Sequence, residues 1–272
     1  MKSIAVFSLL LCTLAAVRAA EPAEERVLHV GDAQTAAILP TAAAIAGSTT
    51  AVTFVEAPDL AETGQVLEAA ANGRQYDLLA LQLFGHRTGT SVEDETAQAE
   101  ALIASFLEAH PEARVRLLQP PTDGSRHFDE VTRSWDGHAW VDNCSRAQRA
   151  HHREVAAALR ERFGAETINE VPIAGASAAL HDEIMARGEE SPIYHISDLL
   201  AQGGMSARPS RTGIYLGALV WLAATSPEAL ADAPRTEGIE IEADHLQPSK
   251  APAGVDDEQA AMLRDVARRA TR

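Results

Sequence analysis

Short apolar runs alternate with longer helical stretches over most of the chain, and this alternation constrains the fold more than any other feature. Val, Leu and Ile are concentrated in the short runs, whereas the stretches between them are Ala-rich or amphipathic. Strands separated by helices indicate βαβ units, which build a mostly parallel sheet covered on both faces. The five predicted strands cover residues 27–31, 51–55, 76–84, 114–119 and 167–172.

Helices are predicted between and after these strands. Ser91, with Asp94 three residues later, resembles a capping box and marks the start of a helix that runs to His110. The apolar segment 213–224 indicates a buried helix that is too short to span a bilayer. Residues 226–254 have weak periodicity and are expected to be irregular. The other predicted helices cover residues 34–46, 60–71 and 145–163, and a last helix begins at Asp256.

Residues 1–19 are typical of a secretory signal peptide. Lys2 gives a positively charged start, residues 4–17 are apolar, and Val17 and Ala19 are small residues at the positions that a signal peptidase reads. We therefore expect an exported protein, periplasmic or extracellular, without a membrane span in the mature chain. Residues 26–272 are expected to form a single domain, with the last helix docked on it.

The charge balance excludes one class of partner. The 272 residues carry 23 Lys and Arg against 39 Asp and Glu, a formal net charge of -16. Nucleic-acid binding needs a basic surface, so no nucleic-acid partner is expected. Cleavage would also remove Cys12, which leaves Cys144 alone and permits no internal disulfide.

No metal or cofactor site is predicted. His151 and His152 are adjacent, so on a helix they point in different directions and chelate one ion poorly. The chain contains no His-Glu-x-x-His motif and no paired cysteines. A lone Cys144 is more typical of a small buried residue than of a nucleophile.

Three segments, VLHVGDAQTAAILP, YDLLALQLFG and RPSRTGIYLGALVWLAA, occur in the order seen in the SGNH (GDSL-like) hydrolases, and the chain resembles a secreted bacterial subgroup of that family. The resemblance implies a flavodoxin-like α/β/α sandwich. It also implies ester hydrolysis, in which the serine of a Gly-Asp-Ser turn is the nucleophile and a late Asp-x-x-His supplies the base and its orienting carboxylate. A backbone amide, a glycine and an asparagine stabilise the oxyanion.

The sequence departs from that family at the positions that carry the chemistry. Asp32 of the turn is retained, but Ala33 occupies the position of the nucleophilic serine. Arg208 stands where the histidine is expected, and Met205 where its aspartate is expected. Loss of nucleophile and base together predicts that family-type ester hydrolysis has been lost.

The same resemblance predicts a binding pocket at the carboxyl ends of the strands. Gly85 is retained after the third strand, followed by His86 and by Arg87 in place of the oxyanion-hole asparagine. Arg87 and Arg208 would suit a carboxylate, sulfate or phosphate, or would form salt bridges with local acidic residues. Asp32, Gly85, His86, Arg87 and Arg208 are therefore the candidate binding residues.

Two tryptophans lie in the long connection 122–143. Trp135 and Trp140 would either stack on a flat ligand such as a sugar or pin the connection to the domain. His195 with Asp198 could replace the missing base, although a helix-surface histidine is the simpler interpretation. Turn or helix-capping roles are expected for Ser206 and Ser210.

Three functional hypotheses remain open. The first is an exported SGNH-like protein that has lost ester hydrolysis and binds a carbohydrate or anionic small molecule. The second is a divergent ester or acetyl-ester hydrolase with a different nucleophile or base. The third is a structural or partner-binding envelope protein.

Overall fold

The structure is a computed structural model, which describes residues 25–57, 59–60, 73–85, 89–120, 128–129, 134–142, 147–201, 208–230, 236, 239–241 and 255–272. For residues 128–129 and 134–135 only the backbone is described. The predicted helix 60–71 falls almost entirely outside these residues.

A five-stranded, wholly parallel sheet forms the centre of the molecule, and its strand order is β2-β1-β3-β4-β7. The α/β fold class predicted from the alternating pattern is confirmed. The strands are β1 (Arg26–Gly31), β2 (Ala51–Glu56), β3 (Leu78–Gln82), β4 (Arg114–Leu118) and β7 (Ile168–Val171). Gly31 ends β1 as predicted, whereas β3 ends at Gln82, two residues before Phe84.

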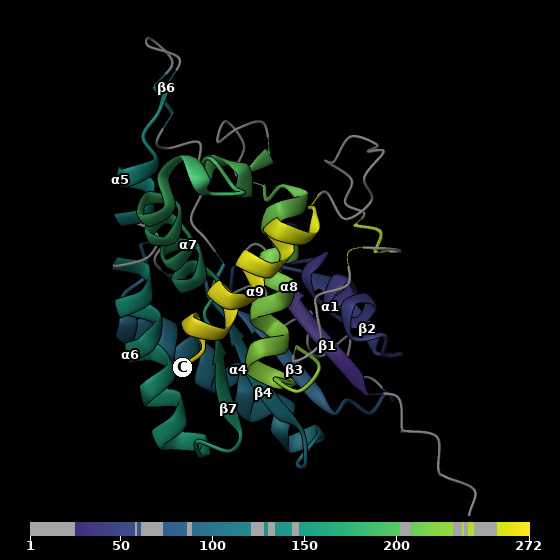
Figure 1. Cartoon of the computed structure of the whole chain (residues 1–272). Helices are drawn as coiled ribbons and strands as arrows, with labels where there is room; N and C mark the ends of the chain where they lie inside the picture. Colours follow the sequence, from purple (N-terminus) through teal and green to yellow (C-terminus); the bar gives the residue numbers. More distant parts are fainter. Residues whose placement is uncertain are drawn as a thin grey trace, which may run out of the picture.

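Helices cover both faces of the sheet, which gives three layers (Figure 1). One face packs against α4 (Val92–Ala109) and α6 (Gln148–Phe163). The other face packs against α1 (Ile38–Ala46), α7 (Ile173–Arg187), α8 (Arg211–Thr225) and α9 (Asp257–Ala270). This arrangement is the three-layer sandwich expected from the sequence.

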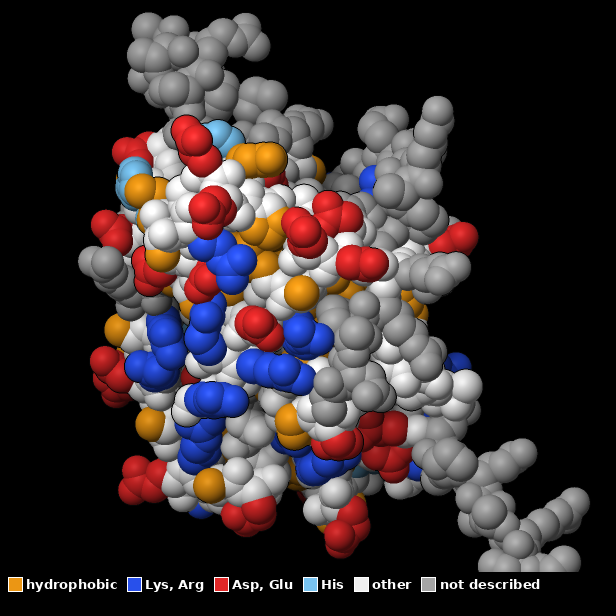
Figure 2. Space-filling model, in the orientation of Figure 1, with side chains coloured by type: hydrophobic (Ala, Val, Ile, Leu, Met, Phe, Trp, Pro, Cys, Tyr) orange, Lys and Arg blue, Asp and Glu red, His pale blue; other side chains and the backbone are white. Residues whose placement is uncertain are grey.

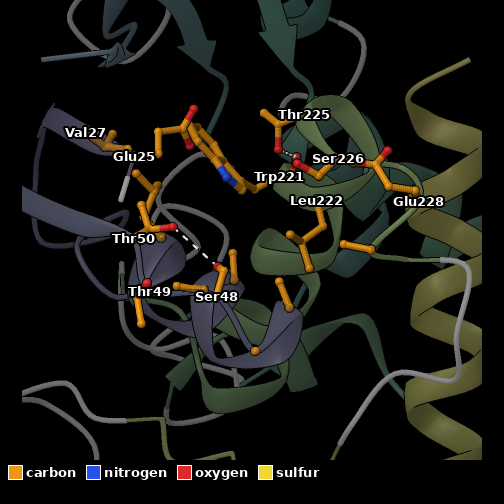
Figure 3. A pocket seen from close by; sticks show the side chains of 16 residues that line it. Glu25, Val27, Ser48, Thr49, Thr50, Trp221, Leu222, Thr225, Ser226 and Glu228 are labelled. Carbon is orange, nitrogen blue, oxygen red and sulfur yellow. Dashed lines mark hydrogen bonds between the residues drawn. The ribbon is translucent and has the colours of Figure 1, made fainter. Parts of the chain in front are cut away.

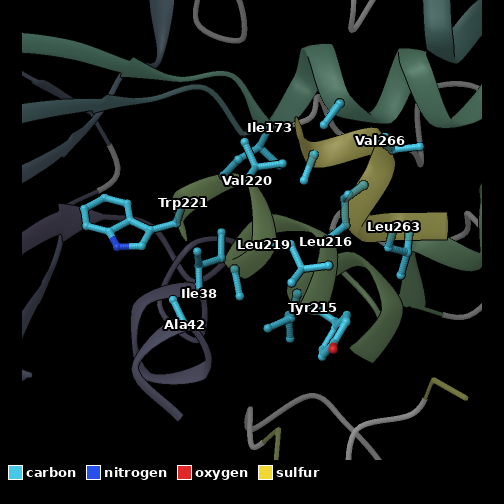
Figure 4. Packing of buried hydrophobic residues seen from close by; sticks show 14 of the residues in the cluster. Ile38, Ala42, Ile173, Tyr215, Leu216, Leu219, Val220, Trp221, Leu263 and Val266 are labelled. Carbon is cyan, nitrogen blue, oxygen red and sulfur yellow. The ribbon is translucent and has the colours of Figure 1, made fainter. Parts of the chain in front are cut away.

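Helix α8 is the centre of the second helical layer. Nine consecutive residues from Ile214 to Leu222 are buried, because α1, α7 and α9 all pack against this helix. Figure 4 shows Leu219 and Val220 of α8 between residues of α1 and α7, with Leu263 and Val266 of α9 on the other side. Asp256 is the N-cap of α9, and its carboxylate accepts a hydrogen bond from the Gln259 amide at 2.9 Å. The apolar stripe of α9 packs on α7 and α8.

Several elements are not predicted from the sequence. They are α7, the short α5 (Gly137–Val141), the 3-10 helices η3 (Gly188–Glu190) and η4 (Ile196–Leu199), and the two-stranded antiparallel sheet of β5 (Phe128–Asp129) and β6 (Ser134–Trp135). Helix α4 is capped by Ser91, whose hydroxyl accepts from the Asp94 amide at 3.0 Å, as the capping pattern predicts. Within the described part of the chain, none of the helices combines the length and apolarity needed to cross a membrane.

Candidate functional site

The turn after β1 is built around a glycine and an aspartate. A Cβ at Gly31 would lie 2.5 Å from Thr35 Oγ1 and 2.8 Å from Gln82 Oε1, so only glycine permits this close approach. Asp32 Oδ1 accepts from the Gln34 amide at 2.9 Å, and the Thr35 amide donates to the Asp32 carbonyl at 3.1 Å. The turn therefore leads directly from the carboxyl end of β1 toward α1.

A buried polar network holds this turn against the neighbouring strand. Gln82 Oε1, at the end of β3, accepts from the Asp32 amide at 3.1 Å and from Thr35 Oγ1 at 2.8 Å. His29 Nε2 lies 3.1 Å from the same Thr35 hydroxyl. His29 is completely buried, and burial lowers its pKa from 6.5 to about 3, so the imidazole is neutral.

The His29–Thr35 pair is a hydroxyl within hydrogen-bond reach of a histidine, but its arrangement is that of a structural contact. The Thr35 hydroxyl has one proton, and two oxygens accept it, Gln82 Oε1 at 2.8 Å and the Asp32 carbonyl at 3.3 Å. His29 Nε2 is therefore the donor to Thr35 and not the acceptor of its proton. Both side chains are completely buried. A nucleophile needs a base that takes its proton and an open path to the substrate, and this pair supplies neither.

A second pair, which the sequence analysis does not identify, lies at the carboxyl end of β3. Glu95 of α4 is 1% exposed, and its Oε1 accepts from the backbone amides of Phe84 and Gly85, both at 2.6 Å. Its Oε2 lies 2.7 Å from Nε2 of His151 on α6. This carboxylate–histidine pair orients an imidazole that is 13% exposed at the sheet edge where catalytic bases are found in α/β folds.

The close approach of Glu95 and His151 requires a glycine at position 85. A Cβ on Gly85 would overlap Glu95 Oε2 and would lie 2.5 Å from His151 Nε2. The glycine after the third strand is therefore explained by close packing against a buried carboxylate and imidazole.

The start of α8 lies at the same edge of the sheet. The end of α8 contributes Trp221 and Thr225 to a cavity with Val27, which is near the amino end of β1, so the helix runs back along the sheet from the carboxyl edge. Ser210 caps α8 by accepting from the Gly213 amide at 3.2 Å, as expected, and its hydroxyl also donates to the Asp198 carbonyl. Arg208 precedes this cap and is exposed.

The structure thus places Asp32, Ala33, Gly85 and Arg208 toward the carboxyl edge of the sheet, where the resemblance expects them. Contact of all four with one ligand remains a prediction. The other predicted site residues, His86, Arg87, Met205 and the side chain of Trp135, lie outside the described residues, as do Ser206 and Cys144.

Trp140 requires a correction. A ligand-stacking role is one of its two predicted alternatives, but its side chain is completely buried in the cluster that includes α7 and α8. It therefore anchors α5 to the helices of this layer. An indole with no exposed face does not bind a sugar from solvent.

The structure separates the other histidines that the sequence pattern brings to attention. His195 is exposed at the start of η4, and its backbone amide donates to Asp198 Oδ2 at 3.4 Å, which corresponds to the helix-surface interpretation. His151 and His152 point in different directions, since His151 bonds Glu95 and His152 is buried. Over the described ranges, no three His, Cys, Asp or Glu side chains are grouped so that they could hold a metal ion.

Cavities occur at both ends of the sheet. A cavity of about 120 Å³ borders Phe84, Gly85 and Glu95 at the carboxyl end. A larger cavity, about 470 Å³, lies at the amino end between α1 and α8 (Figure 3). In Figure 3 the Trp221 indole projects from α8 toward Val27 and Glu25, and Thr49 and Thr50 line the opposite side. This second cavity is not predicted from the sequence, because its lining is dispersed over three segments of the chain.

No protein-family model matches the sequence, and no curated protein matches it. Several solved structures are similar to this chain. A DUF4886 family protein from Bacteroides uniformis is 14% identical, with a TM-score of 0.57 over 91% of this chain and 94% of that chain. A protein provisionally described as a GDSL-like lipase, from Parabacteroides merdae, is 16% identical, with a TM-score of 0.51 over 74% of this chain and 95% of that chain. At these identities the similarity shows the fold, and the chain has the five-stranded parallel α/β fold of SGNH-hydrolase structures.

Proposed function

We propose that this is an exported SGNH-like protein that does not hydrolyse esters and that binds a carbohydrate or anionic small molecule at the carboxyl edge of its sheet. The observation that carries the proposal is the turn after β1. Ala33 ends in a methyl group, and the hydroxyl two residues later, on Thr35, is buried and donates to Gln82. Export is inferred from residues 1–19 alone.

The arrangement around the turn also supports binding. Asp32 is partly exposed next to the position of Ala33, and its backbone is fixed by Gln82. A rigid turn that ends in a carboxylate can orient the hydroxyl groups of a sugar. Arg208, exposed at the start of α8, would suit an anionic substituent.

A divergent hydrolase is a second candidate, and the Glu95–His151 pair favours it. A carboxylate that holds an imidazole at the carboxyl edge is the orienting half of a catalytic triad. For this candidate His151 would be the base, and the nucleophile would come from a residue other than position 33.

Hydrolysis assays separate the two candidates. Purified protein is incubated with short-chain p-nitrophenyl esters and with acetylated sugars, together with the His151→Gln variant. We expect no turnover above buffer for either protein. Turnover by the wild type that His151→Gln abolishes would establish the second candidate and refute the first.

Binding is tested with a panel of mono- and oligosaccharides and small carboxylates by ligand-induced thermal shift. Asp32→Asn keeps an oxygen that can accept from the Gln34 amide, so it tests the charge without removing the turn bond. The matched control is Thr49→Ala, at the amino-end cavity. We expect the shift to be lost in Asp32→Asn and kept in Thr49→Ala. The reverse result would locate the ligand in the cavity of Figure 3 and would refute the proposed site.

A further inference from the structure

Arginine side chains gather along one side of the molecule, at the free edge of β7. Arg149, Arg153 and Arg160 are spaced at positions i, i+4 and i+11 of α6, which puts them on one face of the helix. Together with Arg272 they line a cavity of about 290 Å³ between α6, β7 and the end of α9. Figure 2 shows Lys and Arg side chains concentrated over this part of the surface.

The cavity has an excess of positive charge in a protein that is strongly acidic. Among its lining side chains are four guanidinium groups and a single carboxylate, that of Glu170. Glu170 is already paired with Arg160, whose Nη1 donates to Oε1 at 2.7 Å. Over the described part of the chain, neither Arg149 nor Arg153 forms an ion pair with a carboxylate. These two cations are therefore not neutralised by any carboxylate that the structure describes.

Arg149 is held in place against α7. Its Cδ, Nε and Cζ atoms all lie 3.6 Å from where a Cβ of Gly175 would be, so the side chain extends flat across the first turn of that helix. Its Nε is buried and has no hydrogen-bond partner. Burial lowers the pKa of Arg149, and the neighbouring Arg153 lowers it further. A partly buried guanidinium with an unsatisfied donor requires an anionic partner to offset its desolvation.

The amino end of α7 lies next to Arg149, and its Ala174 amide already donates to the Gln119 carbonyl at 2.9 Å. The helix begins at Ile173, after Pro172, with no side-chain cap and no acidic residue in its first turn. The amino end of a helix carries a partial positive charge and attracts anions. A guanidinium next to such a helix end adds a second positive charge, and Pro172 itself lines the cavity.

The edge of β7 does not provide a place for an added strand. Thr167 and Val171 face β4, since their carbonyl groups accept from β4 and the residue after it. Ile168 and Glu170 therefore face outward, but the Ile168 amide donates to the Gly164 carbonyl and the Glu170 amide donates to the Asn169 side chain. With these donors occupied, an extended peptide is not the expected occupant.

We propose that this cavity is an anion-binding site, separate from the carboxyl-edge site, and that it takes a tetrahedral oxyanion of the phosphate or sulfate type through Arg149 and Arg153. Guanidinium groups bind the oxygens of such anions in bidentate geometry. A dianion would neutralise both unpaired arginines at once, whereas a monocarboxylate would neutralise only one.

The site is tested by calorimetric titration with inorganic phosphate, inorganic sulfate and acetate, in chloride buffer of constant ionic strength. The variants are Arg149→Gln and Arg153→Gln. The matched control is Arg162→Gln, which removes the same charge from α6 at an exposed arginine paired with Glu100 at 3.0 Å. We expect saturable one-to-one binding of phosphate or sulfate, weaker binding of acetate, and a loss of affinity of about tenfold or more in each site variant. Arg162→Gln should stay within about twofold of the wild type.

Two outcomes would overturn the proposal. One is the absence of saturable phosphate or sulfate binding up to about 10 mM. The other is an equal loss of affinity in Arg162→Gln and Arg149→Gln, which would show attraction to the general charge of α6. Thermal unfolding with and without the anion gives a second readout, and Arg153→Gln, at an exposed position, keeps the test valid if Arg149→Gln does not fold.

Discussion

Replacement of Glu95 by alanine should strongly destabilise the protein. In the folded chain one carboxylate oxygen accepts from the Phe84 and Gly85 amides, and the other bonds His151. Glu95→Ala removes the acceptor for all three groups in surroundings where the carboxylate is 1% exposed. Water replaces such an acceptor poorly in a packed interior.

The expected loss of unfolding free energy in Glu95→Ala follows from these hydrogen bonds. A buried donor left without an acceptor costs about 1–3 kcal/mol, so two backbone amides and the lost packing amount to about 3–5 kcal/mol. Glu93→Ala is the matched control, because Glu93 lies in the same first turn of α4 but is exposed. It should cost about 0.3–1 kcal/mol, through the lost interaction with the helix dipole.

Urea unfolding followed by far-UV circular dichroism measures both values. A Glu95→Ala cost within about 1 kcal/mol of the Glu93→Ala cost would refute the reasoning, because it would mean that the amides find other acceptors. Glu95→Gln refines the test. Its amide oxygen can take the place of Oε1 and keep both backbone bonds, so its cost should be less than half that of the alanine variant.

Three further predictions concern the same edge of the sheet. Gly85→Ala should lower the free energy of unfolding, measured with urea, by about 2–4 kcal/mol, because its Cβ would overlap Glu95. Gly175→Ala is the control, and it should be neutral or stabilising because its Cβ would lie at an ordinary contact distance of 3.6 Å from Arg149. As the pH falls from 6.5 to about 5, His29 should lower the free energy of unfolding by up to about 1.4 kcal/mol per pH unit. The reason is that the unfolded chain binds a proton at His29, whereas the folded chain, in which the His29 pKa is about 3, does not. Urea unfolding at several pH values should show that this contribution to the pH dependence disappears in His29→Gln. Ala33→Ser alone should give no p-nitrophenyl ester turnover above the wild type, because Arg208 cannot accept the serine proton; turnover in that variant would mean that another base reaches position 33.

The sheet could be predicted from the sequence because each strand is a short apolar run bounded by polar residues or proline. Helix α7 could not, and its first turn explains why. It begins after Pro172 without a capping side chain or an acidic residue, and its buried face is made partly of Ala174, Gly175 and Ala176. Small residues give a weak apolar period, so neither the start of the helix nor its periodicity is evident before the fold is known.

The Glu95–His151 pair shows which part of the candidate site could not be predicted from the sequence. Three acidic residues open α4, and such a cluster is normally exposed and favourable to the helix dipole. Glu95 differs from its neighbours because it shares a helix face with Ala99, Leu102 and Phe106, all of which are buried. A carboxylate on the apolar stripe of a helix was the available signal. Its partner, 56 residues away on another helix, is specified only by the packing of α4 on α6.

In the turn after β1, the residues that fix the backbone are different from the residue at the position of the family's nucleophile. Its shape depends on Gly31, on the hydrogen bonds of Thr35 and Gln82, and on the Asp32 carboxylate, while the side chain of residue 33 makes none of these contacts. Serine and alanine differ there by one partly exposed hydroxyl, so Ala33→Ser should change the free energy of unfolding by less than about 0.5 kcal/mol. A fold maintained by the neighbours of the reactive position can keep its geometry after that position has lost its nucleophile. For this chain, similarity to the solved structures is therefore evidence about the fold, and the residues around the turn decide what chemistry is possible there.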